Sequence, residues 1–266
     1  MGGGYKVYYI DEILELNYDS IIISVANEKS IRSIYEQLLD LKINAHKIKI
    51  LMHDEDLKYN VFSNINRYDE KTDVRVLWIK AFAEFIYDEN ISGNVAECGV
   101  NRGELSEYIN KYFYDRKLYM FDTFRGFDRK DVDFERSLNN QKYNNGSFNN
   151  TTSFHITSVD IVRNRMPYAD QCEIRQGYFP DTAQDLDDKF CFVSLDMDLY
   201  KPMKAGLEDF YPKMVNNGCI LMHDYFHPEL PGVRSAIKDY EKEHGIHLCK
   251  MPIGDYCSIA IIKNGV

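Results

Sequence analysis

The sequence predicts an α/β protein, in which a small α/β segment precedes a Rossmann-like, mostly parallel sheet that ends in an antiparallel hairpin. Short apolar runs alternate with segments whose apolar residues recur at helical spacing. This alternation is typical of a parallel sheet covered by helices on both faces. The last two apolar runs have no helix between them, which indicates the antiparallel hairpin at one edge.

Composition and charge exclude several classes of protein. The chain has 266 residues, of which 44% are hydrophobic and 28% charged, as in ordinary globular proteins. Its net charge of −10 argues against a nucleic-acid partner, because proteins that bind phosphate backbones are basic. No apolar run reaches the roughly 20 residues that span a bilayer, and the start lacks a signal-peptide pattern. We therefore expect a cytoplasmic protein without a membrane partner, and the six cysteines, which form no C-x-x-C pair, to be reduced.

Residues 1–66 have the pattern of a partial Rossmann-like unit. The expected elements are strands at 6–10, 20–25 and 47–51 and a helix at 28–41. The glycine-rich turn that would hold a phosphate is absent from this part of the sequence. We therefore expect a role in packing or dimerisation rather than in nucleotide binding, and a homodimer is a candidate assembly.

Residues 67–266 contain the longer α/β pattern. The expected helices lie at 73–87, 104–113, 158–165, 204–211 and 233–243, and the expected strands at 94–100, 117–124, 172–179, 190–199, 218–225, 247–252 and 256–263. A polar, Asn-rich insert at 128–157 interrupts this pattern and is too polar to bury much surface. It is either a disordered surface loop or a lid that closes over the substrate.

The ends of the first strands carry candidate cofactor ligands, since ligands of open parallel sheets bind beyond the carboxyl ends of the strands. Gly99 and Gly103 follow the first strand and allow a sharp turn close to a ligand, whereas a G-x-G-x-x-G or Walker motif is missing. Asp122 ends the next strand about 20 residues later, where a carboxylate can accept both hydroxyls of a ribose. Gly177 and Tyr178 form a turn that either flanks an adenine ring or belongs to the core.

Two later strands end in a group of acidic residues with a histidine. Asp196 and Asp198 follow one apolar run, and His223 and Asp224 follow the next. Extended geometry would place Asp196 and Asp198 on the same side, and neighbouring strands would bring all four residues together. Crowded carboxylates either remain solvated or bind a cation; oxygen ligands suit Mg²⁺, and an added imidazole also allows Mn²⁺.

These segments together resemble the macrocin O-methyltransferase (TylF-like) family, whose members methylate sugar hydroxyls in antibiotic pathways. The similarity runs from about residue 74 to 263 and rests on the segments VAECGVNRGELS, FDTFRGF, GYFPDT, SLDMDLYKPMKAGLEDFYPKMVNNGCILMHDYF and PGVRSAIKDY. The resemblance implies a class I methyltransferase sheet. It also implies methyl transfer from S-adenosylmethionine to a hydroxyl, assisted by Mg²⁺, with a sugar or nucleotide sugar as the substrate.

The resemblance also implies roles for individual residues. Glu97, Gly99 and Gly103 would shape the methionine pocket, and Asp122 would hold the ribose. Asp196 and Asp224 would bind the metal, with His223 at the third ligand position. Asp198 would accept the proton of the substrate hydroxyl. We also expect cofactor contacts from Gly177, Tyr178 and Asp196.

One departure from the family pattern leaves alternatives open. The family usually has two consecutive aspartates where this chain has His223-Asp224. His223 would therefore act either as a metal ligand or as the catalytic base. A non-catalytic accessory domain of a larger glycan-modifying protein is the main alternative function. A metal-dependent phosphoesterase would also explain the carboxylates, but it leaves Asp122 and the glycine turn without a role.

Overall fold

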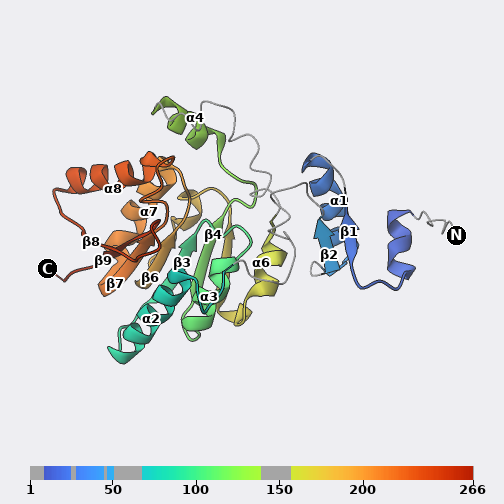
Figure 1. Cartoon of the computed structure of the whole chain (residues 1–266), viewed down its shortest axis with the longest axis horizontal. Coiled ribbons are helices and arrows are strands. Elements are labelled where there is room, and N and C mark those ends of the chain that lie inside the picture. The colour runs from blue at the N-terminus through green and yellow to red at the C-terminus, as the bar shows by residue number, and fades with distance from the viewer. Residues whose placement is uncertain (1–8, 25–27, 45–46, 51–67, 139–156, 266) are drawn as a thin grey trace. The chain divides into compact units, whose positions relative to one another are not determined.

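The chain forms two compact units, Met1–Arg67 and Tyr68–Val266, each with its own sheet (Figure 1). A computed structural model describes the residues 9–24, 28–44, 47–50, 68–138 and 157–265. Among these residues, no helix combines the length and hydropathy that a bilayer-spanning helix requires.

The smaller unit contains a βαβ arrangement. Strands β1 (Ile21–Ile23) and β2 (Ile48–Ile50) pair in parallel, and α1 (Glu28–Asp40) lies between them in the chain. The predicted strand at 6–10 lies mostly outside the described residues. Ile10, the last residue of that predicted strand, instead begins the 3₁₀ helix η1 (Ile10–Glu15). The Glu12 carboxylate caps this helical turn by accepting a hydrogen bond from the backbone N–H of Tyr9.

The larger unit is built on a seven-stranded sheet with the order β5-β4-β3-β6-β7-β9-β8. Its strands are β3 (Asn94–Cys98), β4 (Leu118–Asp122), β5 (Cys172–Gln176), β6 (Phe190–Leu195), β7 (Met214–Met222), β8 (Cys249–Pro252) and β9 (Ile259–Ile262). Strand β9 runs antiparallel to both of its neighbours, and all other pairs are parallel. The predicted mostly parallel sheet with a C-terminal antiparallel hairpin is confirmed.

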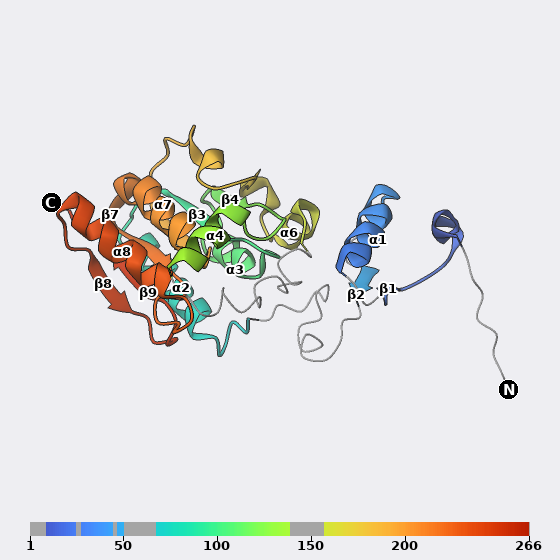
Figure 2. The same ribbon diagram turned by 90° about the horizontal axis from the view of Figure 1, so that it is seen from above.

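Helices cover both faces of this sheet (Figures 1 and 2). One face carries α2 (Val74–Asp88), α3 (Glu104–Tyr112) and α6 (Val159–Arg165), and the other carries α4 (Arg129–Ser137), α7 (Tyr200–Phe210) and α8 (Pro231–His244). Successive residues of β4 alternate between the two cores: Tyr119 and Phe121 face one, and Leu118 and Met120 the other. Burial on both faces explains why the strands are continuous apolar runs in the sequence.

Several element boundaries differ from the predictions near the polar strand ends. Strand β6 ends at Leu195 rather than 199, because Asp198 has a φ of +60°, which is incompatible with an extended strand. Strand β7 ends at Met222 rather than 225, and Asp224 has a φ of +59°. Helix α7 begins before the predicted residue 204, because Pro202 occupies its first turn, where a helix needs no backbone N–H donor.

The first part of the Asn-rich insert is a helix, which the sequence did not predict. The Asp128 carboxylate caps α4 by accepting a hydrogen bond from the backbone N–H of Lys130. Asp131 and Glu135 on this helix are buried, and Glu135 accepts a hydrogen bond of 3.0 Å from the backbone N–H of Tyr200 on α7. The expectation that the insert buries little surface is therefore wrong for 128–138, and 139–156 lie outside the described residues.

Candidate functional site

The strand ends of the sheet position the candidate residues through backbone hydrogen bonds. The chain runs outward from β3 to β5 and then returns to add β6 on the other side of β3, so the order of strands reverses between β3 and β6. Beyond the strands, the N–H of Asp196 donates to the carbonyl of Cys98 at 2.8 Å, and that of His223 donates to the carbonyl of Leu195 at 2.9 Å. The side chains of Asp196 and His223 therefore leave the sheet at its reversal point, where ligands of open α/β sheets bind.

The two glycines after β3 meet different physical requirements. Gly99 has a φ of +87°, and a Cβ there would lie 1.9 Å from the carbonyl oxygen of Asp196, so only glycine allows the loops after β3 and β6 to approach so closely. Gly103 has a φ of +73° at the start of α3, and a Cβ there would press on Val162 and Met166. Gly103 thus serves the packing of α3 against α6 and the adjoining Met166.

A cavity of about 690 Å³, including its opening to solvent, lies beyond the ends of β3, β4, β5 and β6. Five of the residues that the sequence analysis predicted to contact a cofactor line this cavity: Gly99, Asp122, Gly177, Tyr178 and Asp196. Asp198 also lines it, whereas Glu97, Gly103, His223 and Asp224 are not among the lining residues. Asp131 of α4 contributes to the wall and accepts a hydrogen bond of 3.1 Å from the Tyr178 hydroxyl.

The Asp122 carboxylate is held by backbone donors. Its Oδ2 accepts from the N–H of Asn101 at 2.7 Å, and its Oδ1 accepts from the N–H of Phe124 at 2.7 Å. Burial raises the pKa of Asp122, and these hydrogen bonds partly oppose that rise. A carboxylate oxygen has two lone pairs, so each oxygen can still accept a hydrogen bond from a ligand hydroxyl in the cavity.

Glu97 is fully buried behind the glycine turn. It accepts a short hydrogen bond from the Ser106 hydroxyl on α3, and its side chain is 1% exposed. Burial raises the pKa of Glu97 to about 8, although Ser106 and the nearby Arg75 oppose this effect. Its predicted role in a methionine pocket stays a prediction.

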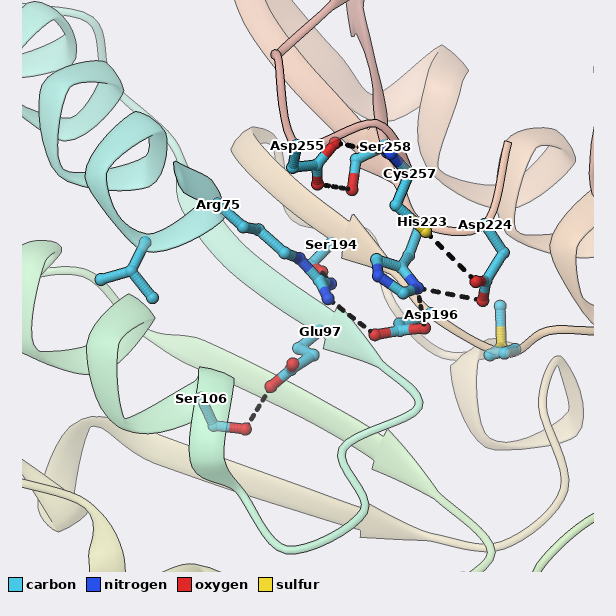
Figure 3. A network of polar contacts seen from close by, with 12 residues as sticks. Arg75, Glu97, Ser106, Ser194, Asp196, His223, Asp224, Asp255, Cys257 and Ser258 are labelled. Carbon is cyan, nitrogen blue, oxygen red and sulfur yellow. Dashed lines mark hydrogen bonds and ion pairs between the residues drawn. The ribbon is translucent and has the colours of Figure 1, made fainter. Parts of the chain in front are cut away.

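Three carboxylates converge beside the cavity. His223 lies against two of them, those of Asp196 and Asp224 (Figure 3). Ligand oxygens of Asp196, Asp198 and Asp224 all lie within 4.8 Å of one another. His223 Nδ1 lies 3.1 Å from Asp196 Oδ1 and 3.0 Å from Asp224 Oδ2. The four residues therefore meet, but the expected route through strand alternation is wrong, because the left-handed conformation of Asp198 turns the chain after β6.

The charges in this cluster shift one another's pKa values. Burial alone would raise the pKa of Asp196, but His223 and Arg75 outweigh it and hold that pKa well below its usual range. Burial together with the neighbouring Asp224 and Asp196 raises the pKa of Asp198 far above its usual value. Burial would lower the pKa of His223, but the adjacent Asp196 raises it overall. The raised pKa of Asp198 means that a third negative charge is costly in this cluster, and a bound cation would offset that cost.

Arg75 belongs to this site although the sequence analysis missed it. It lies in the first turn of α2 and is 3% exposed. Its Nη1 lies 2.9 Å from Asp196 Oδ2, and its Nη2 donates to the Ser194 hydroxyl at 3.2 Å (Figure 3). The available signal was a charged residue flanked by valines in a helix that otherwise presents a broad apolar face.

Residues 71–259 match the model of the macrocin O-methyltransferase (TylF) family. The chain belongs to this family. A relative of this TylF-family chain is the 8-demethyl-8-(2,3-dimethoxy-alpha-L-rhamnosyl)-tetracenomycin-C 4'-O-methyltransferase of Streptomyces olivaceus, which is 22% identical over 178 residues. The aligned region covers 61% of this chain and 63% of that relative, so the chain spans less than two thirds of the relative's length.

Two solved structures share the fold of this TylF-family chain. The O-methyltransferase NovP has a TM-score of 0.59 at 23% identity, covering 72% of this chain and 80% of NovP. The calicheamicin methyltransferase CalS11 has a TM-score of 0.54 at 19% identity, covering 98% of each chain. The predicted class I methyltransferase fold is thereby confirmed.

Replacing Arg75 should destabilise the protein far more than replacing its neutral partner. We expect Arg75→Met to lower the free energy of unfolding by about 3 kcal/mol, because Asp196 loses a buried ion-pair partner. Ser194→Ala, the control, removes one hydrogen bond and should cost about 1 kcal/mol. Urea denaturation of the metal-free proteins measures both values, and equal small losses would contradict a structural role for the ion pair.

Glu97 should make stability fall as pH rises. The ordinary pKa of this carboxyl is 4.5 and its folded pKa is about 8, so between these values the folded state retains a proton that the unfolded state has lost. The stability that Glu97 contributes is complete below pH 4.5 and is lost as pH rises to about 8. Unfolding free energies of the wild type should therefore fall relative to Glu97→Gln across this window. A difference that stayed constant across this window would refute the assignment.

Proposed function

We propose that this chain transfers a methyl group from S-adenosylmethionine to a hydroxyl of a small substrate, a sugar or nucleotide sugar, with the assistance of a divalent metal. The observation that carries the proposal is that a single cavity is lined both by Asp122 and by Asp196 and Asp198. Membership of the macrocin O-methyltransferase family supports the reaction type. The relative's name, which specifies methylation at the 4' position of a rhamnosyl-bearing compound, supports a sugar as acceptor.

The cavity suits the proposed cofactor in the placement of its polar groups. It opens beyond the strand ends, where ligands of open α/β sheets bind. In the proposed complex, Asp122 accepts hydrogen bonds from the two ribose hydroxyls, because it lines the cavity and each of its oxygens has a second lone pair. Gly177 and Tyr178 then flank the adenine, with the Tyr178 ring held by its hydrogen bond to Asp131.

The acidic cluster fits a divalent cation. In octahedral coordination with bonds of 2.0–2.1 Å, adjacent ligand atoms lie about 3 Å apart. His223 Nδ1 has this separation from Asp196 Oδ1 and Asp224 Oδ2, at 3.1 and 3.0 Å. Asp196 and Asp224 would hold Mg²⁺ or Mn²⁺, with His223 as the third ligand. When bound, such a cation supplies the positive charge that lowers the pKa of an adjacent hydroxyl.

Asp198 is the proposed general base, because it lines the cavity and His223 does not. A cation bound by the neighbouring Asp196 and Asp224 would offset the charges that raise the pKa of Asp198 and would leave its carboxylate ionised. Asp198 accepts the proton of the acceptor hydroxyl while that oxygen forms a bond to the methyl carbon. The bond between this carbon and sulfur breaks, and its electron pair stays on sulfur to give S-adenosylhomocysteine. The sulfonium methyl is already activated, so the remaining task of the protein is to hold oxygen, carbon and sulfur in line. Arg75 keeps Asp196 ionised and oriented throughout.

Calorimetric titration with S-adenosylhomocysteine tests the cofactor site. We expect Asp122→Asn to weaken binding about 10- to 100-fold, as for the loss of a charge-assisted hydrogen bond worth about 1.5–3 kcal/mol. Asp187→Asn, an exposed change outside the cavity, should bind like the wild type. If the wild type bound neither S-adenosylmethionine nor its product with any divalent metal, the accessory-domain alternative would replace the proposal.

The general base is tested by turnover with nucleotide sugars that carry vicinal hydroxyls, followed by the release of S-adenosylhomocysteine. Asp198→Asn should lower kcat about 10²- to 10⁴-fold, since the hydroxyl proton loses its acceptor. Its affinity for S-adenosylhomocysteine should stay near that of the wild type. Turnover at the wild-type rate would rule out Asp198 as the base.

A further inference from the structure

A cysteine from another part of the chain completes a second set of ligand groups beside the acidic cluster. Cys257, in the loop between β8 and β9, places its Sγ 3.4 Å from Asp224 Oδ1 (Figure 3). Ligand atoms of His223, Asp224 and Cys257 all lie within 4.8 Å of one another. Asp224 is therefore shared between an all-oxygen set and a set with nitrogen, oxygen and sulfur donors.

We propose that the metal centre takes Zn²⁺ or a similar transition-metal ion in preference to Mg²⁺, with the Cys257 thiolate and the His223 imidazole as ligands beside Asp224. The inference rests on the proposed function, because it specifies the ion that the acidic cluster of that function holds. It adds a ligand, Cys257, and a selectivity that an all-carboxylate centre lacks.

The donor atoms determine this preference. Mg²⁺ is bound by oxygen ligands and by water, so a thiolate and an imidazole contribute little to its binding. Both groups are preferred ligands of Zn²⁺, with bonds of about 2.3 Å to sulfur and about 2.0–2.1 Å to nitrogen. Tetrahedral geometry with these bond lengths places a sulfur and an oxygen ligand about 3.5 Å apart. The observed 3.4 Å between Cys257 Sγ and Asp224 Oδ1 matches that separation.

The loop that carries Cys257 is held in position before any metal binds. Asp255 Oδ1 accepts hydrogen bonds from the backbone N–H groups of Cys257 and Ser258, at 2.9 and 2.7 Å. The carbonyl of Cys257 accepts a hydrogen bond of 3.1 Å from the N–H of Phe226, two residues after Asp224. These bonds tie the thiol to the segment that carries the other two ligands. Such supporting contacts orient ligands and lower the entropic cost of assembling a metal site.

Cobalt substitution tests the inference directly, because a thiolate bound to Co²⁺ gives charge-transfer absorption in the near ultraviolet that oxygen and nitrogen ligands do not give. The full chain, stripped of metal and kept reduced, is titrated with Co²⁺. The band should form in the wild type and in Cys249→Ser, which removes an exposed cysteine from β8. It should be absent in Cys257→Ser. Zn²⁺ should displace the cobalt, and a large excess of Mg²⁺ should not.

The variants also separate ligand loss from misfolding. Cys257→Ser should weaken Zn²⁺ binding at least tenfold. Mutation of a residue that only hydrogen-bonds to a metal ligand already costs about that much affinity, and loss of a ligand should cost more. Cys257→Asp replaces the thiolate by a carboxylate, so it should still bind Co²⁺ but without the charge-transfer band. Thermal unfolding of metal-free Cys257→Ser should match that of the metal-free wild type, since a serine hydroxyl can replace the thiol as donor to Asp224.

Each contrary result has a distinct meaning. Cobalt that binds with only weak visible d–d absorption would overturn thiolate ligation, while the metal-assisted reaction would stand. A band that depended on Cys249 rather than Cys257 would identify adventitious binding by an exposed thiol and would also overturn the inference. A wild type that bound neither Co²⁺ nor Zn²⁺ would overturn both the inference and metal assistance. In that case the S-adenosylhomocysteine titration would still decide, separately, whether the chain binds the methyl donor.

Discussion

The ion pair between the buried Arg75 and the partly buried Asp196 is the interaction on which the site depends. It joins the first turn of α2 to the end of β6, so one helix and the centre of the sheet together fix the position of one carboxylate. Desolvation of both charges is costly, and the pair persists because Ser194 and His223 also contact these two side chains. Asp196 therefore remains ionised at the reversal point of the sheet, where the other carboxylates and the cavity meet.

The remaining geometry follows from how closely the loops approach that carboxylate. The absence of a side chain at Gly99 lets the loop after β3 cross the backbone of Asp196, which places the cavity directly against the acidic cluster. Asp198 then reaches the cavity from a left-handed turn, while His223 and Asp224 approach from the end of β7. Polar groups from separate strands thus gather at one edge, although each strand is apolar along its length. In the proposed reaction, this arrangement places donor, acceptor and base within one small volume.

The sequence predicted the sheet and its helices well, because apolar periodicity is a local property of each segment. It also placed Asp122 and the acidic residues correctly at strand ends, since polar residues that terminate apolar runs are visible in one dimension. It missed Arg75, whose partner lies 121 positions away, and Cys257, which lies 33 positions from Asp224. Neither pairing leaves a local pattern. It also missed α4, where the burial of Asp131 and Glu135 depends on tertiary contacts that polarity alone conceals.

Helix α4 has a consequence for which parts of the cavity wall can change independently. The walls around Asp122 and Asp196 come from strand ends, so substitutions there disturb the core that supports the whole domain. The wall near Asp131 comes from α4, which is anchored to α7 through contacts such as the hydrogen bond from Tyr200 to Glu135. Substitutions on the cavity side of α4 therefore need not disturb the sheet. In the proposed enzyme, the part of the wall that holds Tyr178 against the adenine is thus separable from the carboxylates that carry out the transfer, so affinity for the methyl donor can be tuned without changing the chemistry.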